Sequence, residues 1–200
     1  MASMTENPYG NEYAGLFSRL KSFLPQGPLL VAIDGGSASG KTTLAAYLSE
    51  RFDGTVFHMD DFFLRTEQRT PARYAEPGGN VDRERFLDEV LLPLKNREAV
   101  SLRKLDHTNG VFRLLPPVTI IPKPFVIVEG AYSMHPDLAD FYDFSVFLRI
   151  PHDLQTRRVL ARNGPEVAQM FFSRWIPLEQ AYFDALHPAE RCDLVIDVLE

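Results

Sequence analysis

Compact apolar runs alternate with longer stretches of helical spacing along most of the chain. The apolar runs predict strands, at Leu29–Asp34, Thr55–Met59, Phe125–Glu129, Phe144–Ile150 and Leu194–Val198. Apolar residues that recur every three or four positions predict helices, at Lys41–Arg51, Arg83–Leu94, Asp153–Arg162 and Pro165–Leu186. Strand and helix in alternation are typical of βαβ units, and strands that are apolar on both faces suit a sheet covered on both sides. The pattern predicts a three-layer α/β domain with a mainly parallel central sheet, whose ligands bind at the carboxyl ends of the strands.

The segments around this alternation have patterns of their own. Residues 11–24 carry apolar side chains at helical spacing and predict an N-terminal helix that packs on the domain. The stretch Arg65–Asn80, with two prolines and two glycines, predicts a loop and a hinge. Residues 99–121 predict a small β-insert, built from short strands at Val100–Leu105 and Val118–Ile121.

Composition narrows the class of protein. The chain has 200 residues, 45% of them hydrophobic and 24% charged, which is typical of a soluble globular domain. The net charge of −6 argues against a nucleic-acid groove, and no apolar run is long enough to span a membrane. The start, Met1–Gly10, lacks the features of a signal peptide, and the single Cys192 cannot form an internal disulfide. We therefore expect a cytoplasmic protein with a small-molecule partner and without nucleic-acid or membrane partners; a homo-oligomer stays open.

The histidines do not have the spacing of zinc ligands. We expect them at the surface or in turns, at His107, His135, His152 and His187.

The segment after the first strand fits the phosphate-binding pattern G-x-x-x-x-G-K-[ST], with a strand before it and a helix after it. Its backbone N–H groups can cradle phosphate oxygens, while the lysine pairs with the β- and γ-phosphates and the first threonine binds Mg²⁺. The residues expected to hold the nucleotide are Gly35, Gly36, Ser37, Ala38, Ser39, Gly40, Lys41, Thr42 and Thr43. The alternative, a flexible Gly/Ser loop, does not account for the flanking strand and helix.

Acidic residues follow two of the other predicted strands. Asp60 and Asp61 come after the second strand, and a carboxylate here can accept a proton from an attacking hydroxyl or help to hold Mg²⁺. We favour Asp60, with the adjacent aromatic Phe62 as a wall of the pocket; the alternative is a helix-capping or turn aspartate. Glu129 ends the third strand, where a carboxylate can support a bound Mg²⁺, although a capping glutamate is the alternative.

Arginines surround a helix break near the C-terminal end of the chain. Arg158 and Arg162 lie one helical turn apart and share a face with each other, and Arg157 and Arg174 lie nearby. Asn163-Gly164-Pro165 interrupts the helix between them, and Glu166 is the one obvious carboxylate partner that we identify for these arginines. The pattern predicts a lid that closes over a phosphoryl group, although a solvated basic face is the alternative.

These motifs together resemble the uridine kinase branch of the P-loop nucleoside kinases, which is related to phosphoribulokinase and bacterial pantothenate kinase. The resemblance covers nearly all of the chain after residue 28. It implies that Asp60, in Met59-Asp60-Asp61-Phe62-Phe63, is the catalytic base, because the segment is similar to the family's Gln-Asp-Ser-Phe-Tyr. It also implies that Glu129 supports the metal with Thr42 and Asp60, and that Lys41, Arg158 and Arg162 stabilise the transferring phosphoryl group.

The same resemblance implies a domain organisation. Residues 1–27 would form a helical extension and residues 28–200 the P-loop kinase domain, with the β-insert at about 99–121 and the lid at about 157–175. The closing Arg191-Cys192-Asp193-Leu194-Val195-Ile196 is similar to the family's last strand.

The acceptor side departs from the family pattern. The family's His-Pro-Asp is replaced by Glu76-Pro77-Gly78-Gly79-Asn80-Val81-Asp82, and its Tyr-Asp appears as Leu105-Asp106, without the aromatic that would stack on a base. The acceptor site then maps to Asp60, Phe62, Tyr74, Asn80, Asp82, Asp106, Arg113 and Arg174. The Asp and Asn side chains of this set suit hydrogen bonds to sugar hydroxyls, whereas base recognition is less well supplied.

The resemblance implies an ATP- and Mg²⁺-dependent kinase that phosphorylates a hydroxyl of a small molecule, with a nucleoside such as uridine or cytidine as the default acceptor. Alternatives are a non-nucleoside acceptor, similar to pantothenate or a sugar phosphate, and a nucleotide-dependent regulatory ATPase. A guanine-nucleotide switch is disfavoured because the sequence has no Asn-Lys-x-Asp motif.

Overall fold

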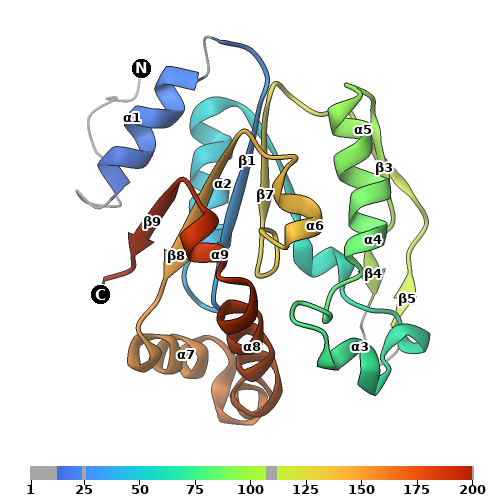
Figure 1. The fold of residues 1–200 in the computed structure, drawn as a ribbon, viewed down its shortest axis with the longest axis vertical. Coiled ribbons are helices and arrows are strands. Elements are labelled where there is room, and N and C mark those ends of the chain that lie inside the picture. Colours follow the sequence, from blue (N-terminus) through green and yellow to red (C-terminus); the bar gives the residue numbers. More distant parts are fainter. Residues whose placement is uncertain (1–12, 24–25, 107–111, 200) are drawn as a thin grey trace.

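The computed structural model describes residues 13–23, 26–106 and 112–199. The expectations for Met1–Gly10 and His107, and for the ends of the predicted helix 11–24, concern residues outside these ranges. A parallel sheet in the order β2-β7-β1-β8-β9 forms the centre of the molecule (Figure 1). Its strands are β1 (Leu29–Gly35), β2 (Gly54–His58), β7 (Phe125–Glu129), β8 (Phe144–Arg149) and β9 (Leu194–Asp197). The sheet and the helices on both of its faces confirm the predicted α/β fold class.

Strand register brings the candidate site residues to one end of the sheet. In β7, Glu129 lies opposite His58 of β2 on one side and opposite Ile33 of β1 on the other. The loop after β1 and the turn after β2 therefore flank the tip of β7. This is the carboxyl end of the strands, where an open parallel sheet binds its ligands.

The two faces of the sheet carry separate apolar clusters. One cluster joins the strands to α1 (Ala14–Phe23), α2 (Lys41–Phe52) and the start of α7 (His152–Met170). The other joins them to α4 (Arg83–Phe86), α6 (Pro136–Ala139) and α8 (Ile176–Leu186). Between α4 and α5 (Leu92–Lys95) the chain forms a π-helical turn at Leu87–Leu91, so the predicted helix Arg83–Leu94 is irregular in its middle.

The N-terminal helix packs as expected. Leu16 and Leu20 of α1 are fully buried in the cluster on its face of the sheet. The ring of Phe17 packs edge-on against that of Tyr47 in α2, with centroids 5.7 Å apart. The predicted amphipathic pattern therefore reflects packing on the domain.

The β-insert contains more elements than the sequence predicted. Strand β3 (Val100–Leu102) pairs with β6 (Val118–Ile120), and β4 (Leu105–Asp106) pairs with β5 (Arg113–Leu114). The predicted strand Val100–Leu105 is thus split into β3 and β4, and the stretch expected to link the strands contains β5.

The stretch Arg65–Asn80 is also more ordered than predicted. It contains a 3-10 turn at Thr66–Gln68 and the short helix α3 (Pro71–Ala75). The Thr70 side chain caps α3 by accepting a hydrogen bond from Arg73 N, and Pro71 suits the first helical position. Arg73 then donates to the carbonyl oxygens of Gly79 and Val81. These bonds hold the two ends of the segment together. The segment is therefore partly helical and internally bonded, and the prediction of a loop throughout Arg65–Asn80 is wrong.

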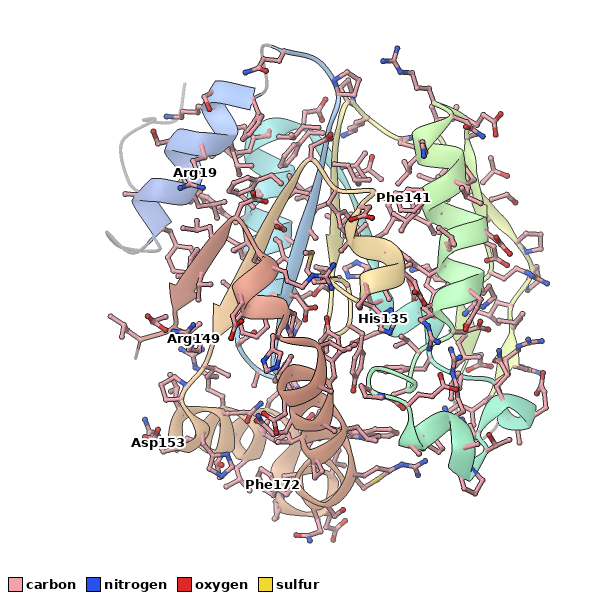
Figure 2. The ribbon with its side chains drawn as sticks, viewed as in Figure 1. Arg19, His135, Phe141, Arg149, Asp153 and Phe172 are labelled. Carbon is pink, nitrogen blue, oxygen red and sulfur yellow. The ribbon has the colours of Figure 1, made fainter. Side chains whose placement is uncertain are left out.

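The predicted helix break near the C-terminal end is confirmed. Within α7, Gly164 has φ 72° and ψ 167°, a conformation that is essentially restricted to glycine. Beyond the break the chain runs through a π-helical turn at Phe171–Trp175 into α8, and α9 (Pro188–Arg191) precedes the last strand. Phe172 marks the junction between α7 and α8 in Figure 2. None of the helices in the described ranges combines the length and the apolar character that a membrane span needs.

Candidate active site

The phosphate-binding loop follows β1 and leads into α2. Gly35 has φ 143°, and a Cβ there would collide with the carbonyl oxygen of Leu148 in the neighbouring strand β8. The Nζ of Lys41, a nearly buried residue, donates a hydrogen bond to the carbonyl oxygen of Gly36 at 2.8 Å. The Ser39 hydroxyl is buried without a hydrogen-bond partner among residues 13–23, 26–106 and 112–199. The loop thus holds a cation and an unpaired hydroxyl in the place where the sequence predicts phosphate binding.

Glu129 joins the loop to the second strand. Its Oε1 accepts a hydrogen bond from Thr42 Oγ1 at 3.1 Å and lies 2.6 Å from Nδ1 of His58. The side chain of Glu129 is 5% exposed, whereas that of His58 is 38% exposed. The hydrogen bond to Glu129 raises the pKa of His58, although partial burial opposes this shift. The oxygens of Thr42 and Glu129, two of the predicted metal-site residues, are therefore brought together.

Asp60 lies next to this group, in the 3-10 turn Met59–Phe62 that follows β2. Its carboxylate forms no hydrogen bond or ion pair within the described ranges, and its side chain is open to solvent. The surrounding protein raises the pKa of Asp60 by desolvation, while the charge of Lys41 opposes the shift and that of Glu129 adds to it. Asp60 is thus a free carboxylate within the electrostatic reach of both groups.

The neighbouring Asp61 has a different environment. Its carboxylate pairs with Nζ of Lys104 at 2.8 Å, and its carbonyl oxygen accepts a hydrogen bond from Arg85. These contacts tie the turn to the β-insert and to α4. The structure therefore distinguishes two adjacent aspartates, and the one without partners is the one that the sequence favoured.

Helices α7 and α8 hold the phosphate-binding loop at Ser37. Glu179 of α8 accepts hydrogen bonds from Ser37 N at 2.8 Å and from Ser37 Oγ at 2.5 Å. Gln155 of α7 donates its Nε2 to the Ser37 carbonyl oxygen at 3.0 Å. Glu179 is 6% exposed; burial raises the pKa of its carboxyl, and the charge of Lys41 opposes this.

Asp34, at the end of β1, also bonds to the start of the phosphate-binding loop. This fully buried carboxylate accepts hydrogen bonds from Gly35 N at 2.6 Å, Met134 N at 2.9 Å and the Tyr182 hydroxyl at 2.8 Å. Burial raises its pKa, and these three donors oppose the shift. Asp34 therefore connects the end of β1 to α8 and to the loop after β7.

The arginines near the helix break have different partners. Arg158 Nη1 donates to the Ala38 carbonyl oxygen at 3.4 Å, so this side chain reaches the phosphate-binding loop. Arg162 lies over the Phe171 ring, 5.4 Å from its centroid. Arg157 pairs with Asp153 at 2.9 Å, which corrects the expectation that Glu166 is the one nearby carboxylate partner. Asp153 lies on the outer side of α7 in Figure 2.

Several residues predicted to hold the acceptor are engaged in the scaffold. Asp82 caps α4 by accepting from Arg85 N at 3.2 Å, and Arg85 Nε lies 3.4 Å from the same carboxylate. Asp106 pairs with Arg113 at 3.1 Å across the β4–β5 hairpin. Asn80 is buried, and its side chain bonds to the Tyr132 phenol.

The aromatic residue after Asp60 is a correction to the prediction. Phe62 is 1% exposed and packs edge-on against Phe86, with centroids 4.9 Å apart, so it belongs to the core and cannot wall a pocket. Phe63 faces the C-terminal helices instead, and its ring stacks on that of Trp175 at 6.2 Å. Tyr74 and Arg174 meet beside this stack, with the guanidinium 4.9 Å from the centre of the Tyr74 ring.

Comparison with known proteins agrees with this geometry. The model of the "Phosphoribulokinase / Uridine kinase family" matches residues 30–166. The uridine kinase of Staphylococcus haemolyticus is 30% identical over 146 residues, which cover 68% of this chain and 69% of the relative. That of Borreliella burgdorferi is 25% identical over 178 residues, which cover 84% of this chain and 85% of the relative. A solved structure from Bacillus stearothermophilus, described as a "Possible Uridine Kinase", has a TM-score of 0.65 at 25% identity and covers 92% of this chain and 100% of its own.

The chain belongs to the phosphoribulokinase/uridine kinase family. Membership makes it a P-loop phosphotransferase that acts on a hydroxyl group, which confirms the predicted family and enzyme class. The family also implies that the loop binds a nucleotide. The residues present fit such a ligand: Lys41 can turn from the Gly36 carbonyl to a phosphate, and the unpaired Ser39 hydroxyl can donate to one. The oxygens of Thr42 and Glu129, which lie 3.1 Å apart, suit Mg²⁺, which prefers oxygen ligands.

Reasoning from the sequence missed other residues around the phosphate-binding loop. His58, Glu179 and Asp34 were not among the candidates, although each bonds to a residue of the loop or to Glu129. For His58 a signal existed, because it ends β2 just as Glu129 ends β7. Asp34 offered a weaker signal, as a charged residue at the end of an apolar strand. Glu179 lies 142 positions from Ser37, and nothing in the local pattern joins the two.

Proposed function

We propose that the protein transfers the γ-phosphoryl group of ATP to a hydroxyl of a small molecule that binds beside Asp60. The observation that carries the proposal is the free carboxylate of Asp60 next to Lys41 and Glu129. A carboxylate in this position can accept the proton of the attacking hydroxyl, provided that the hydroxyl comes within hydrogen-bond distance. A raised pKa suits this task, because it makes the carboxylate a stronger base than an ordinary aspartate.

The remaining loop residues would bind and orient the nucleotide. Lys41 and the backbone N–H groups of the loop would hold the β- and γ-phosphates, and Thr42 with Glu129 would hold Mg²⁺. Mg²⁺, when bound, offsets the negative charge on the phosphate oxygens. His58 would keep the Glu129 carboxylate oriented, as partners of metal-binding carboxylates commonly do.

The segment 157–175 would act as a lid. Arg158 already reaches the loop through the Ala38 carbonyl, and Arg162 is held by no carboxylate among the described residues. A change in the chain direction at Gly164 can bring Arg162 toward the transferred group, where a guanidinium stabilises the charge of the transition state.

The relatives named uridine kinase make a nucleoside the first acceptor to test. The acceptor side supports this less directly than the nucleotide side, because Asp82 and Asp106 are engaged with arginines and Leu105 replaces the family's aromatic residue. A non-nucleoside alcohol is the second acceptor class within the same activity.

The test is a coupled ADP-release assay with ATP and Mg²⁺ over nucleosides, sugars, sugar phosphates and pantothenate. We expect ADP release that depends on one acceptor class and that falls by about 10³-fold in Lys41→Ala, whose fold should persist because the side chain points to the loop. ADP release that is independent of any acceptor would favour a regulatory ATPase. Unchanged turnover in a folded Lys41→Ala protein would contradict the proposal.

A further inference from the structure

Two arginines beside the Asp60 turn have no carboxylate partner among the described residues. Arg69 donates its Nε to the Leu64 carbonyl oxygen at 2.9 Å, and its guanidinium lies 3.4 Å from the centre of the Phe112 ring. Arg174 lies over the rings of Tyr74 and Trp175, 4.9 Å from each centre. Besides the Leu64 carbonyl, the Tyr74 phenol is the polar partner of Arg69 within the described ranges, and the structure shows the Arg174 guanidinium against aromatic rings only.

Other arginines nearby in the sequence do have carboxylate partners. Arg65, Arg73, Arg83 and Arg85 come from the same stretch of chain, and each pairs with at least one carboxylate. The segment therefore offers acidic partners to most of its cations. Arg69 of this stretch, and Arg174 across from it, have no carboxylate partner in the part of the chain that the structure describes.

Tyr74 joins the two unpaired arginines. Arg174 stacks on its ring, and its phenol lies close enough to Arg69 to raise the pKa of that guanidinium. The dominant effect on Arg69 is desolvation, which lowers its pKa, and the charge of Arg174 lowers it further. The Tyr74 hydroxyl is buried and has no well-aligned hydrogen-bond partner. Two cations that repel each other thus lie beside the same phenol without an acidic partner among the described residues, an arrangement that an anion would stabilise.

The cluster lies on the acceptor side of the site. Leu64, which anchors Arg69, comes four positions after Asp60, and Phe63 between them stacks on Trp175. Figure 1 shows α3, which contains Tyr74, and α8, which follows Trp175, at the same end of the sheet as the phosphate-binding loop. The side chains of Glu179, Gln155 and Arg158 bond to the phosphate-binding loop, and Arg69 and Arg174 are not among its partners in the described ranges.

We propose that Arg69, Arg174 and the Tyr74 hydroxyl bind an anionic group, a phosphate or a carboxylate, that is carried by the phosphoryl acceptor. The proposal rests on the proposed kinase function and narrows its acceptor to a negatively charged alcohol. A neutral nucleoside would leave both guanidinium groups without a counter-charge. Guanidinium forks bind phosphate and carboxylate well because they donate paired hydrogen bonds in a fixed plane.

The first test measures binding without catalysis. Trp175 is the single tryptophan of the chain and lies beside Arg174, so its fluorescence reports on the cluster. With the phosphate-binding loop filled by a non-hydrolysable ATP analogue and Mg²⁺, inorganic phosphate should change the fluorescence saturably. Arg69→Gln should weaken this binding by about tenfold or more, as the loss of a charged hydrogen bond implies. Arg51→Gln, an exposed variant at the C-terminal end of α2, should bind phosphate like the wild type. The same titration with acetate shows whether the cluster binds a carboxylate as well as it binds phosphate.

The second test uses pairs of acceptors that differ in one charge. The assay compares kcat/KM for ribose 5-phosphate with ribose, and for pantothenate with panthenol. We expect the charged member of one pair to be preferred by about 100-fold, and Arg69→Gln and Arg174→Gln to remove most of that preference. The identity of the preferred pair shows whether the anion is a phosphate or a carboxylate.

The outcomes separate this proposal from the kinase function. Saturable phosphate binding that depends on Arg69, without ADP release for any acceptor, would uphold the anion site and reject the kinase. ADP release with neutral nucleosides, without phosphate binding and with unchanged kinetics in Arg69→Gln, would uphold the kinase and overturn the anion site. Phosphate binding of equal strength in the wild type and in Arg69→Gln would also overturn it, whatever the activity.

Discussion

His58 and Glu129 lie opposite each other at the carboxyl ends of β2 and β7, with Nδ1 of one 2.6 Å from Oε1 of the other. The same carboxylate oxygen accepts a hydrogen bond from Thr42 in the phosphate-binding loop. The tip of β7 is therefore held from both neighbouring strands. This geometry makes His58 a residue that positions the proposed metal site.

Replacement of His58 by Ala should free Glu129 to rotate away from Thr42. Partners of metal ligands typically contribute 10- to 100-fold to metal affinity or activity, so the Mg²⁺ concentration for half-maximal rate should rise by about tenfold. Steady-state rates at varied Mg²⁺ and saturating ATP measure the effect. His152→Ala is the control, since His152 lies on α7 away from Glu129. If the wild type, His58→Ala and His152→Ala need the same Mg²⁺ concentration for half-maximal rate, His58 does not position the metal site.

Glu179 places a negative charge against the N–H of Ser37, in a loop that is otherwise suited to anions. The Glu179→Gln substitution keeps the size of the side chain and removes the charge, which should strengthen ATP binding several-fold by the loss of repulsion between charges. Calorimetric titration of ATP·Mg²⁺ measures the change. Ser37→Ala removes one hydrogen bond and no charge, and it should change the affinity far less. Weaker ATP binding in Glu179→Gln would show that the carboxylate mainly supports the loop.

Gly164 provides the bend that the lid proposal requires. Its φ of 72° and ψ of 167° would cost a residue with a Cβ about 1–3 kcal/mol, so Gly164→Ala should alter the path of the helix and lower kcat by about tenfold. Gly15→Ala, within α1, is a matched substitution that should leave kcat unchanged. In the wild type, residues 157–175 should gain protection from amide exchange when an ATP analogue, Mg²⁺ and acceptor are bound. Equal protection with and without these ligands would contradict a lid.

His135 should make stability dependent on pH. It is 7% exposed, and its Nδ1 accepts a hydrogen bond from Asp137 N at the start of α6 (Figure 2), so it closes a turn, as one of the two expectations had it, but does not lie at the surface. Burial lowers its pKa, with the charge of Arg83 contributing. The unfolded chain therefore binds a proton more readily, and the stability contribution present above about pH 6.5 should decline as the pH falls below it.

The measurement is the melting temperature of the wild type and of His135→Asn between pH 7.5 and pH 5.5. Asparagine can also accept the capping hydrogen bond but does not titrate. The wild type should lose more stability than the variant over this range. Parallel curves for the two proteins would show that His135 does not titrate on unfolding.

Features of the structure that are encoded by residues close together in the sequence were predictable from the sequence. The phosphate-binding loop, the strands of the sheet and the break at Gly164 are encoded by short patterns in glycine, proline and apolar residues. Asp60 and Glu129 followed from the rule that ligands gather at the carboxyl ends of parallel strands. Arg157 and Asp153 are four positions apart on one helix, a spacing at which helical ion pairs form, so local sequence also encodes this pair.

Contacts between distant segments were not predictable in this way. Glu179 reaches Ser37, and Tyr182 reaches Asp34, across almost the whole chain. Phe62 and Phe63 are adjacent aromatics, and only the packing of α4 against the turn decides that Phe62 is buried while Phe63 meets Trp175. Tertiary packing, which a single sequence does not display, decided each of these cases.

The central claim, that Asp60 accepts the proton of the attacking hydroxyl, is tested most directly by comparing Asp60→Asn with Asp61→Asn. The two aspartates are adjacent, but Asp61 pairs with Lys104 whereas Asp60 has no partner in the described ranges. With the acceptor identified by the ADP-release assay, kcat of Asp60→Asn should fall by about 10²- to 10⁴-fold while ATP·Mg²⁺ affinity changes little. Asp61→Asn should retain most of its kcat. Equal losses in the two variants, or a loss of ATP·Mg²⁺ affinity in Asp60→Asn without a loss of kcat at saturation, would contradict the claim.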